Sequence, residues 1–158
     1  MIIKHLQTDD IAAVEQLISQ SGPFVRPRTA SDYWVYAELF SSTCPVAIDH
    51  GELVGAIIAF RSQEKPGEIY IQDVAVHPAH RRRGVTHALM DALHQRATAW
   101  GGERIYLTSE PENTAARATW PALGFVNVPG DQTIDGVSVI SDYKGPGKHR
   151  AVYELIIK

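Results

Sequence analysis

The feature that most constrains this chain is the short run Arg81-Arg82-Arg83-Gly84, which lies between a β-rich segment and a strongly periodic helical one. Residues 68–76 are predicted to form a strand, and His77-Pro78 ends it. From Val85 to Trp100 apolar residues recur at helical spacing, which predicts a long amphipathic helix directly after the glycine. This order directs unpaired backbone N–H groups and the positive end of the helix at one point. We therefore expect an anion-binding site at the loop.

The composition of the loop indicates which anion it binds. Gly84 lets the backbone approach ligand oxygens closely, and the arginines place positive charge around a pyrophosphate or a ribose phosphate. The alternative is a solvated basic turn. The chain has 15 Lys and Arg against 18 Asp and Glu, a net charge of −3. It therefore lacks the overall positive field expected of a protein that binds nucleic acid or an anionic membrane. The loop matches neither the nucleotide-hydrolase nor the dinucleotide motif.

The 158 residues predict one domain, residues 1–158, that contains both strands and helices. Cys44 is the only cysteine, which excludes an intrachain disulfide and favours a cytoplasmic location. No apolar run is long enough to span a bilayer.

Strands are expected at 2–6, 44–49, 52–61, 68–76, 103–109 and 151–157, with a weak one at 137–141 and another opening at Gly124-Phe125.

Helices are expected from Ile11 to near Gly22, over 85–100, and in two further places. One is capped by Ser31 and carries an apolar side formed by Tyr33, Trp34, Ala37 and Phe40. The other is capped by Asn113 and is interrupted by Pro121.

Two segments carry a resemblance to a known family. The stretch 74–90, with Arg81 and Gly84 at its first two fixed positions, resembles the acetyl-CoA signature of the GCN5-related N-acetyltransferases, Q/R-x-x-G-x-G/A at the head of a long helix. Thr86 departs from it, because the family usually has Gly or Ala there. A second block, Asn113 to Ala116 followed by Leu123-Gly124-Phe125, resembles the family's second cofactor segment.

This resemblance implies a fold and a cofactor site. The implied fold is α+β in three layers, a central mixed and mostly antiparallel sheet flanked by helices, which splays open between the strands at 69–76 and 103–109. The implied co-substrate is acetyl-CoA, whose thioester carbonyl is held by a backbone N–H of the strand. The residues expected to bind it are Val74, Ala75, Val76, Arg81, Arg82, Arg83, Gly84, Val85, Thr86 and Asn113.

The resemblance leaves the catalytic groups open. An amine acceptor must lose a proton before it attacks, yet the position of the family's frequent catalytic Glu falls on Tyr70. Asp73 is one candidate base, although strand alternation turns it away from Gln72 unless a bulge intervenes. Glu110 is the other. The family's thiolate-protonating Tyr is here Trp120, so the acid is Tyr106, Tyr143 or water, or the thiolate leaves without an acid.

A closer likeness concerns the acceptor. The segments 40–47, 54–66 and 111–118 look like those of the diaminobutyrate acetyltransferases, and Tyr33, Gln72 and His149 are the residues expected to contact an acceptor. Three positions depart from that branch by carrying arginine, namely Arg26, Arg28 and Arg150. If they face the cleft, they favour a small amine that also bears a carboxylate or a phosphate.

Two other functions stay open at this point. One is acetylation of a protein N-terminus or lysine, for which the loop at 129–148 would have to leave a groove open for a peptide. The other is a noncatalytic acetyl-CoA-binding module. No metal is expected, because His77-x-x-His80 lacks supporting cysteines or clustered carboxylates. A homodimer is what the resemblance implies for assembly.

Overall fold

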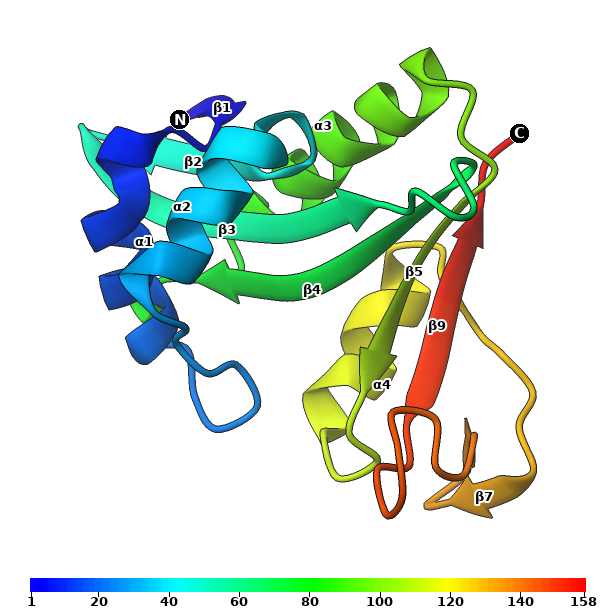
Figure 1. Cartoon of the computed structure of the whole chain (residues 1–158). Coiled ribbons are helices and arrows are strands. Elements are labelled where there is room, and N and C mark those ends of the chain that lie inside the picture. The colour runs from blue at the N-terminus through cyan, green and yellow to red at the C-terminus, as the bar shows by residue number, and fades with distance from the viewer.

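A seven-stranded mixed sheet forms the centre of the computed structural model, which describes residues 1–158 (Figure 1). The strand order is β1-β2-β3-β4-β5-β9-β6, and only β4 and β5 run parallel. The strands are β1 (Ile2–His5), β2 (Pro45–Asp49), β3 (Glu52–Arg61), β4 (Glu68–Val76), β5 (Arg104–Ser109), β6 (Val126–Asn127) and β9 (Ala151–Ile156). This architecture confirms the expected α+β fold with a mixed, mostly antiparallel sheet.

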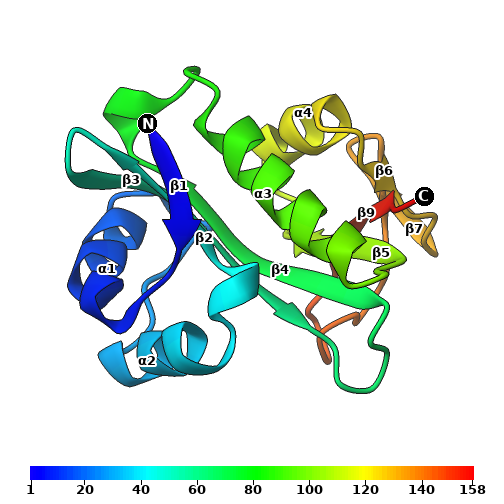
Figure 2. The ribbon, with the colours of Figure 1, turned by 90° about the horizontal axis from the view of Figure 1, so that it is seen from above.

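Four α-helices cover the two faces of the sheet, as Figure 2 shows from above. They are α1 (Ile11–Ser19), α2 (Ala30–Leu39), α3 (Val85–Ala99) and α4 (Thr114–Ala122). Helices α1 and α2 pack with one core cluster, which includes Ile58 and Ala75. Helices α3 and α4 pack with the other, which includes Ile57 and Ile71. None of these helices combines the length and the apolar character needed to cross a membrane.

Strands β4 and β5 pair at one end only. Their register joins Glu68 to Ile71 with Arg104 to Leu107, and beyond Ile71 the two strands diverge (Figure 1). The closed end is held by Arg104, whose guanidinium lies 3.2 Å from a Glu68 oxygen and 3.3 Å from a Glu154 oxygen. The sheet therefore opens over the second half of β4, as the family resemblance implies.

An irregularity in β4 sets which way its side chains point. Ile58 of β3 pairs with Asp73 but the next residue, Ala59, pairs with Ile71, so Gln72 is the extra residue of a β-bulge. Before the bulge, Ile71 packs on the α3 side of the sheet, whereas after it Ala75 packs on the α1 and α2 side. The bulge therefore turns Asp73 to the α2 side together with Gln72.

Some local expectations are wrong in detail. Helix α2 is capped by Thr29 and not by Ser31, because Thr29 and Asp32 form a reciprocal capping box. Trp34 is 48% exposed and does not join the buried side of α2. Pro121 lies in the last turn of α4 without interrupting it.

The chain between β6 and β9 also differs from expectation. The weak strand is β8 (Val137–Val139), and it pairs with a strand that the sequence analysis missed, β7 (Gln132–Ile134). The three remaining short elements are the 3-10 turns η1 (Thr8–Asp10), η2 (Ser41–Thr43) and η3 (Pro78–His80).

Candidate active site

A cavity of about 800 Å³ lies where β4 and β5 diverge. Its wall comes from the α1–α2 loop at residues 21–25, the end of β4, the loop at 81–84, the start of α3 and one side of α4. These elements are far apart in sequence, and the opening of the sheet brings them together (Figure 1). Its volume is large enough for a sizeable organic ligand.

The loop at residues 81–84, here called the Arg-Gly loop, presents free backbone donors to this cavity. Gly84 has a φ of +78° and is the N-cap of α3, so it offers no side chain to cap the helix. The first bond into the helix is from the Ala88 N–H to the Gly84 carbonyl, and the N–H groups of residues 85–87 have no acceptor in the protein. This geometry suits an anionic group.

Most of the residues expected to bind acetyl-CoA line the cavity. They are Val74, Ala75, Val76, Arg81, Arg82, Gly84, Val85, Thr86 and Asn113. Arg83 is the exception, because it does not line the cavity wall. Asn113 also caps α4, since its Oδ1 accepts a hydrogen bond from the Ala116 N–H at 3.3 Å.

Two backbone N–H groups of β4 point into the gap between β4 and β5. The His77 N–H donates to the Val54 carbonyl at 2.8 Å, and hydrogen-bonded and non-bonded pairs alternate along an antiparallel ladder. Val74 and Val76 therefore occupy non-bonded positions against β3 and direct their N–H groups away from it. Because β5 has already diverged, these donors are open to a ligand in the cavity.

Asp73 is a buried carboxylate beside the cavity-lining Val74. The residue is only 7% exposed, and its Oδ2 atom has no hydrogen-bond partner. Its Oδ1 lies 3.9 Å from Arg28 Nη2. Burial raises the pKa of Asp73 above its ordinary value, while Arg28, the Gln72 side chain and Lys144 act in the opposite direction. A carboxylate in this state can accept a proton from a bound amine.

Glu110, the second candidate base, lies among arginines just after β5. Its Oε1 is 3.5 Å from Arg26 Nη2 and 4.0 Å from Arg150 Nη2. The three arginines singled out from the sequence thus contact the two candidate bases. We call these five residues, together with Lys144 from the segment between β8 and β9, the charged cluster.

The end of the α1–α2 loop, which carries Arg26 and Arg28, is fixed to α2. The capping box of Thr29 holds the residue after Arg28, and the Arg28 N–H donates to the Tyr33 hydroxyl at 3.0 Å. Tyr33 is fully buried, so in this structure its side chain positions the loop and does not reach an acceptor.

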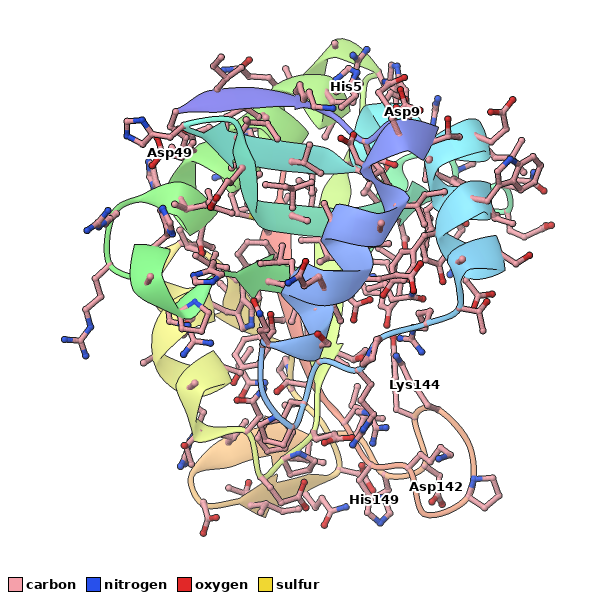
Figure 3. All side chains as sticks on the ribbon, turned by 90° about the vertical axis from the view of Figure 1, so that its left-hand side faces the viewer. His5, Asp9, Asp49, Asp142, Lys144 and His149 are labelled. Atoms are coloured by element: carbon pink, nitrogen blue, oxygen red, sulfur yellow. The ribbon has the colours of Figure 1, made fainter.

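The segment between β8 and β9 brings Lys144 to the same region. Its Nζ lies 2.5 Å from the Tyr70 hydroxyl and 5.0 Å from the centre of the Tyr70 ring. Figure 3 shows Lys144 on this loop, with Asp142 and His149 below it. The Tyr70 hydroxyl is also 3.5 Å from Thr108 Oγ1 of β5. Tyr70 therefore links β4, β5 and the loop.

The other residues expected at the acceptor have local partners. Gln72 donates to the Tyr36 hydroxyl of α2 at 3.0 Å. His149 Nδ1 accepts a hydrogen bond from the Asp142 N–H at 3.0 Å and is partly exposed. His77 and His80 stack edge to face, and no group of three His, Cys, Asp or Glu residues is arranged to hold a metal ion.

Sequence reasoning missed several residues of the site. Residues 21–25 of the α1–α2 loop line the cavity but carry no charged or catalytic side chain that would single them out. Lys144 was missed because only the fold brings it against Tyr70. Trp120 lines the cavity, whereas neither Tyr106 nor Tyr143 does. The cavity wall contains no tyrosine.

Comparisons with known proteins show which family and which fold the chain shares. The sequence model of the Acetyltransferase (GNAT) family matches residues 11–125. The L-2,4-diaminobutyric acid acetyltransferase of Nocardia farcinica is 32% identical over 122 residues, 77% of this chain and 63% of that protein. That of Marinococcus halophilus is 32% identical over 91 residues, 58% of this chain and 53% of that protein.

Among solved structures, diaminobutyrate acetyltransferase EctA from Paenibacillus lautus, in complex with its substrate and coenzyme A, matches with a TM-score of 0.76 at 23% identity. The match covers 99% of this chain and 94% of that one, and it shows a shared fold. The chain spans between 53% and 64% of the length of the curated relatives that it matches.

Proposed function

The chain belongs to the acetyltransferase (GNAT) family, and on that premise we propose that it transfers the acetyl group of acetyl-CoA to the primary amine of a small molecule. One observation carries the proposal. The cavity has free N–H groups at the Arg-Gly loop and open N–H groups on β4, and the buried carboxylate of Asp73 belongs to the residue before the cavity-lining Val74. These are, in turn, groups for a pyrophosphate, a thioester carbonyl and an amine.

The cofactor is proposed to bind along this line of donors. The pyrophosphate accepts hydrogen bonds from the N–H groups of residues 85–87, with Arg81 and Arg82 supplying positive charge. The pantetheine arm runs between β4 and α4, so that the thioester reaches the open N–H groups of Val74 and Val76. These N–H groups stabilise the negative charge that develops on the carbonyl oxygen.

Asp73 is proposed as the base in a direct transfer. The acceptor ammonium gives a proton to the Asp73 carboxylate, and the neutral nitrogen attacks the thioester carbon. The carbon–sulfur bond then breaks, and coenzyme A leaves as a thiolate. Because no tyrosine lines the cavity, water is proposed to take the second proton that the attacking nitrogen must lose and to deliver it to the sulfur, which leaves a neutral amide and the coenzyme A thiol. The transfer needs acetyl-CoA as co-substrate and assigns no step to a metal ion.

Two finer proposals concern the acceptor and the setting. The curated relatives are named for 2,4-diaminobutyric acid, so this amine is the reference compound against which other acceptors are compared. We also propose a cytoplasmic location, with the single cysteine, Cys44, buried and reduced, and a homodimer as the assembly. Sedimentation of the purified protein tests the assembly.

The decisive experiment measures free coenzyme A thiol released from acetyl-CoA by the purified protein. The acceptor panel contains 2,4-diaminobutyrate, amino acids, polyamines, aminoglycosides and short peptides. Release that depends on a small amine supports the proposal. Release with peptides alone identifies a peptide acetyltransferase. Tight acetyl-CoA binding by calorimetry without release from any amine identifies a noncatalytic module.

A further inference from the structure

From the charged cluster we infer that the acceptor carries an acid group in addition to its reactive amine, and no second amine. This inference deepens the proposed function and rests on it. None of the six side chains of the charged cluster lines the cavity, but the cluster is joined to its wall through the backbone, because Asp73 precedes Val74 and Arg26 follows Val25, and both of these neighbours line the wall.

The arginines of the charged cluster are only loosely paired. Their three contacts with Asp73 and Glu110 measure 3.5, 3.9 and 4.0 Å. Elsewhere in the chain, Lys4 lies 2.6 Å from Asp10. Charge-assisted hydrogen bonds are normally about 2.7–2.9 Å long. The guanidinium groups of Arg26 and Arg28 also have no other acceptor. They are therefore available to a ligand.

The charges of the cluster do not balance. Four cationic side chains, Arg26, Arg28, Lys144 and Arg150, face two carboxylates, Asp73 and Glu110. The difference, 4 − 2, leaves two positive charges without a partner in the cluster. An acceptor with one or two acid groups would compensate them, whereas a second ammonium would be repelled.

The amine and the acid group have separate places in this arrangement. Asp73 Oδ2 is buried without a hydrogen-bond partner, and an ammonium is a group that can satisfy it. Arg26 and Arg150 meet from different loops on Glu110, on the β5 side of the opening. An amine at Asp73 would therefore have its acid end directed at these arginines.

Lys144 lies in the same region and comes from a third segment, the one between β8 and β9. It contacts Tyr70 through its hydroxyl and over its ring, and its charge acts on Asp73. The acid group that this chemistry recognises is a carboxylate or a phosphate, since guanidinium groups bind both. Small amino acids with an acidic side chain and amino phosphates are the two sources that fit.

The experiment is a steady-state comparison of matched acceptors with the purified protein. L-Glutamate and L-2,4-diaminobutyrate share a backbone and differ in an acidic or cationic side chain, and β-alanine against propylamine tests a carboxylate as the acid group. 1,3-Diaminopropane removes the carboxylate of diaminobutyrate. Phosphoethanolamine against ethanolamine tests phosphate as the acid group. We expect kcat/KM to be at least about tenfold higher for an acidic acceptor than for its neutral or cationic partner, a difference equivalent to about 1.4 kcal/mol.

Variants then locate the effect. Arg26→Gln and Arg150→Gln should each raise KM for the preferred acidic acceptor about tenfold, with KM for acetyl-CoA unchanged. Arg26 is 67% exposed, so its replacement should not disturb folding. Lys65→Gln is the matched control, because it removes one positive charge from the exposed turn between β3 and β4. It should leave every KM unchanged.

The outcomes separate the inference from the proposed function. Turnover with diaminobutyrate or 1,3-diaminopropane at higher kcat/KM than with any acidic acceptor overturns the inference and leaves the acetyltransferase proposal standing. An equal loss in Lys65→Gln also overturns it. No release of coenzyme A with any amine overturns the proposed function and the inference together.

Discussion

Arg28 Nη2 lies 3.9 Å from Asp73 Oδ1, while the second oxygen of this buried carboxylate has no hydrogen-bond partner. The contact is too long to satisfy the carboxylate, and burial has already removed most of its water. The result is a carboxyl group with a raised pKa on the residue before the cavity-lining Val74. Both a proton and an ammonium ion would stabilise it, and this property underlies its proposed role as the base.

Replacing Asp73 by Asn should remove the base without changing the shape of the site. We expect kcat to fall by about 100-fold or more, in the range typical of general bases, with acetyl-CoA affinity unchanged. In the wild type, kcat should fall as the pH drops through the raised pKa of Asp73, because the protonated carboxyl cannot accept a proton. Stopped-time thiol assays over pH, with calorimetry for acetyl-CoA, measure both quantities.

Glu110→Gln is the comparison for that variant. Glu110 lies near two arginines, and its loss should change the acceptor KM more than kcat. If Glu110→Gln abolishes turnover and Asp73→Asn leaves it intact, the roles assigned to the two carboxylates are reversed.

Asp73→Asn should also change the stability of the protein in a pH-dependent way. The pKa of Asp73 is higher in the folded state than the ordinary 3.8, so its ionisation opposes folding as the pH rises through the folded pKa. At neutral pH, Asp73→Asn should therefore be more stable than the wild type. Below pH 3.8, where both states carry the neutral acid, the difference should disappear. Urea unfolding midpoints at the two pH values test this, and a variant less stable at neutral pH would contradict the burial argument.

The Arg-Gly loop can be tested with a pair of glycines of equal strain. Gly84 has a φ of +78° and Gly51, in the β2–β3 turn, one of +79°, and neither has an atom within 4 Å of an added Cβ. Alanine at either position should destabilise the protein by about 1 kcal/mol. Only Gly84→Ala, and more strongly Arg81→Ala with Gly84→Val, should weaken acetyl-CoA binding in calorimetry. Equal acetyl-CoA affinity in Gly84→Ala and Gly51→Ala, with no loss in the double variant, would show that the pyrophosphate does not bind at this loop.

The sequence predicts most of the helices and strands and the part of the cavity wall around the Arg-Gly loop, because these depend on local patterns. The Arg-Gly loop lies between a strand and an amphipathic helix, so its neighbours in sequence are also its neighbours in space. The opening of the sheet beyond Ile71 was also expected, from the family resemblance.

The acceptor half is less predictable because it depends on relations between distant segments. The direction of Asp73 depends on a bulge at Gln72, which is set by pairing with β3 and leaves no mark in the local pattern. Tyr33 was expected to contact an acceptor, yet it is fully buried in the core cluster of α1 and α2, where its hydroxyl accepts a hydrogen bond from the Arg28 N–H. Lys144 reaches Tyr70 across 74 residues of sequence, a contact that no periodicity indicates.

The thiolate-protonating role left open for Tyr106 and Tyr143 can be tested directly. Neither residue lines the cavity, and the Tyr106 ring packs instead against Tyr70 and under the Arg104 guanidinium. Tyr106→Phe and Tyr143→Phe should therefore each change kcat less than about twofold, since protonation of the sulfur is assigned to water. A loss of 100-fold or more in either variant, with acetyl-CoA affinity intact, would identify that phenol as the acid.

The contact between Lys144 and Tyr70 should contribute to acceptor binding as a unit. Lys144→Met and Tyr70→Phe each remove the 2.5 Å hydrogen bond between the ammonium and the hydroxyl, so the double variant should cost less than the sum of the two. We expect a coupling free energy of about 0.5–1 kcal/mol in the acceptor KM, with the acetyl-CoA KM unchanged. The loop at residues 141–149 should also be cleaved faster by protease in both single variants, because its hold on β4 is lost. Strictly additive effects on KM would mean that the two side chains act independently, and a kcat loss confined to Tyr70→Phe would instead assign the Tyr70 hydroxyl to the chemical step.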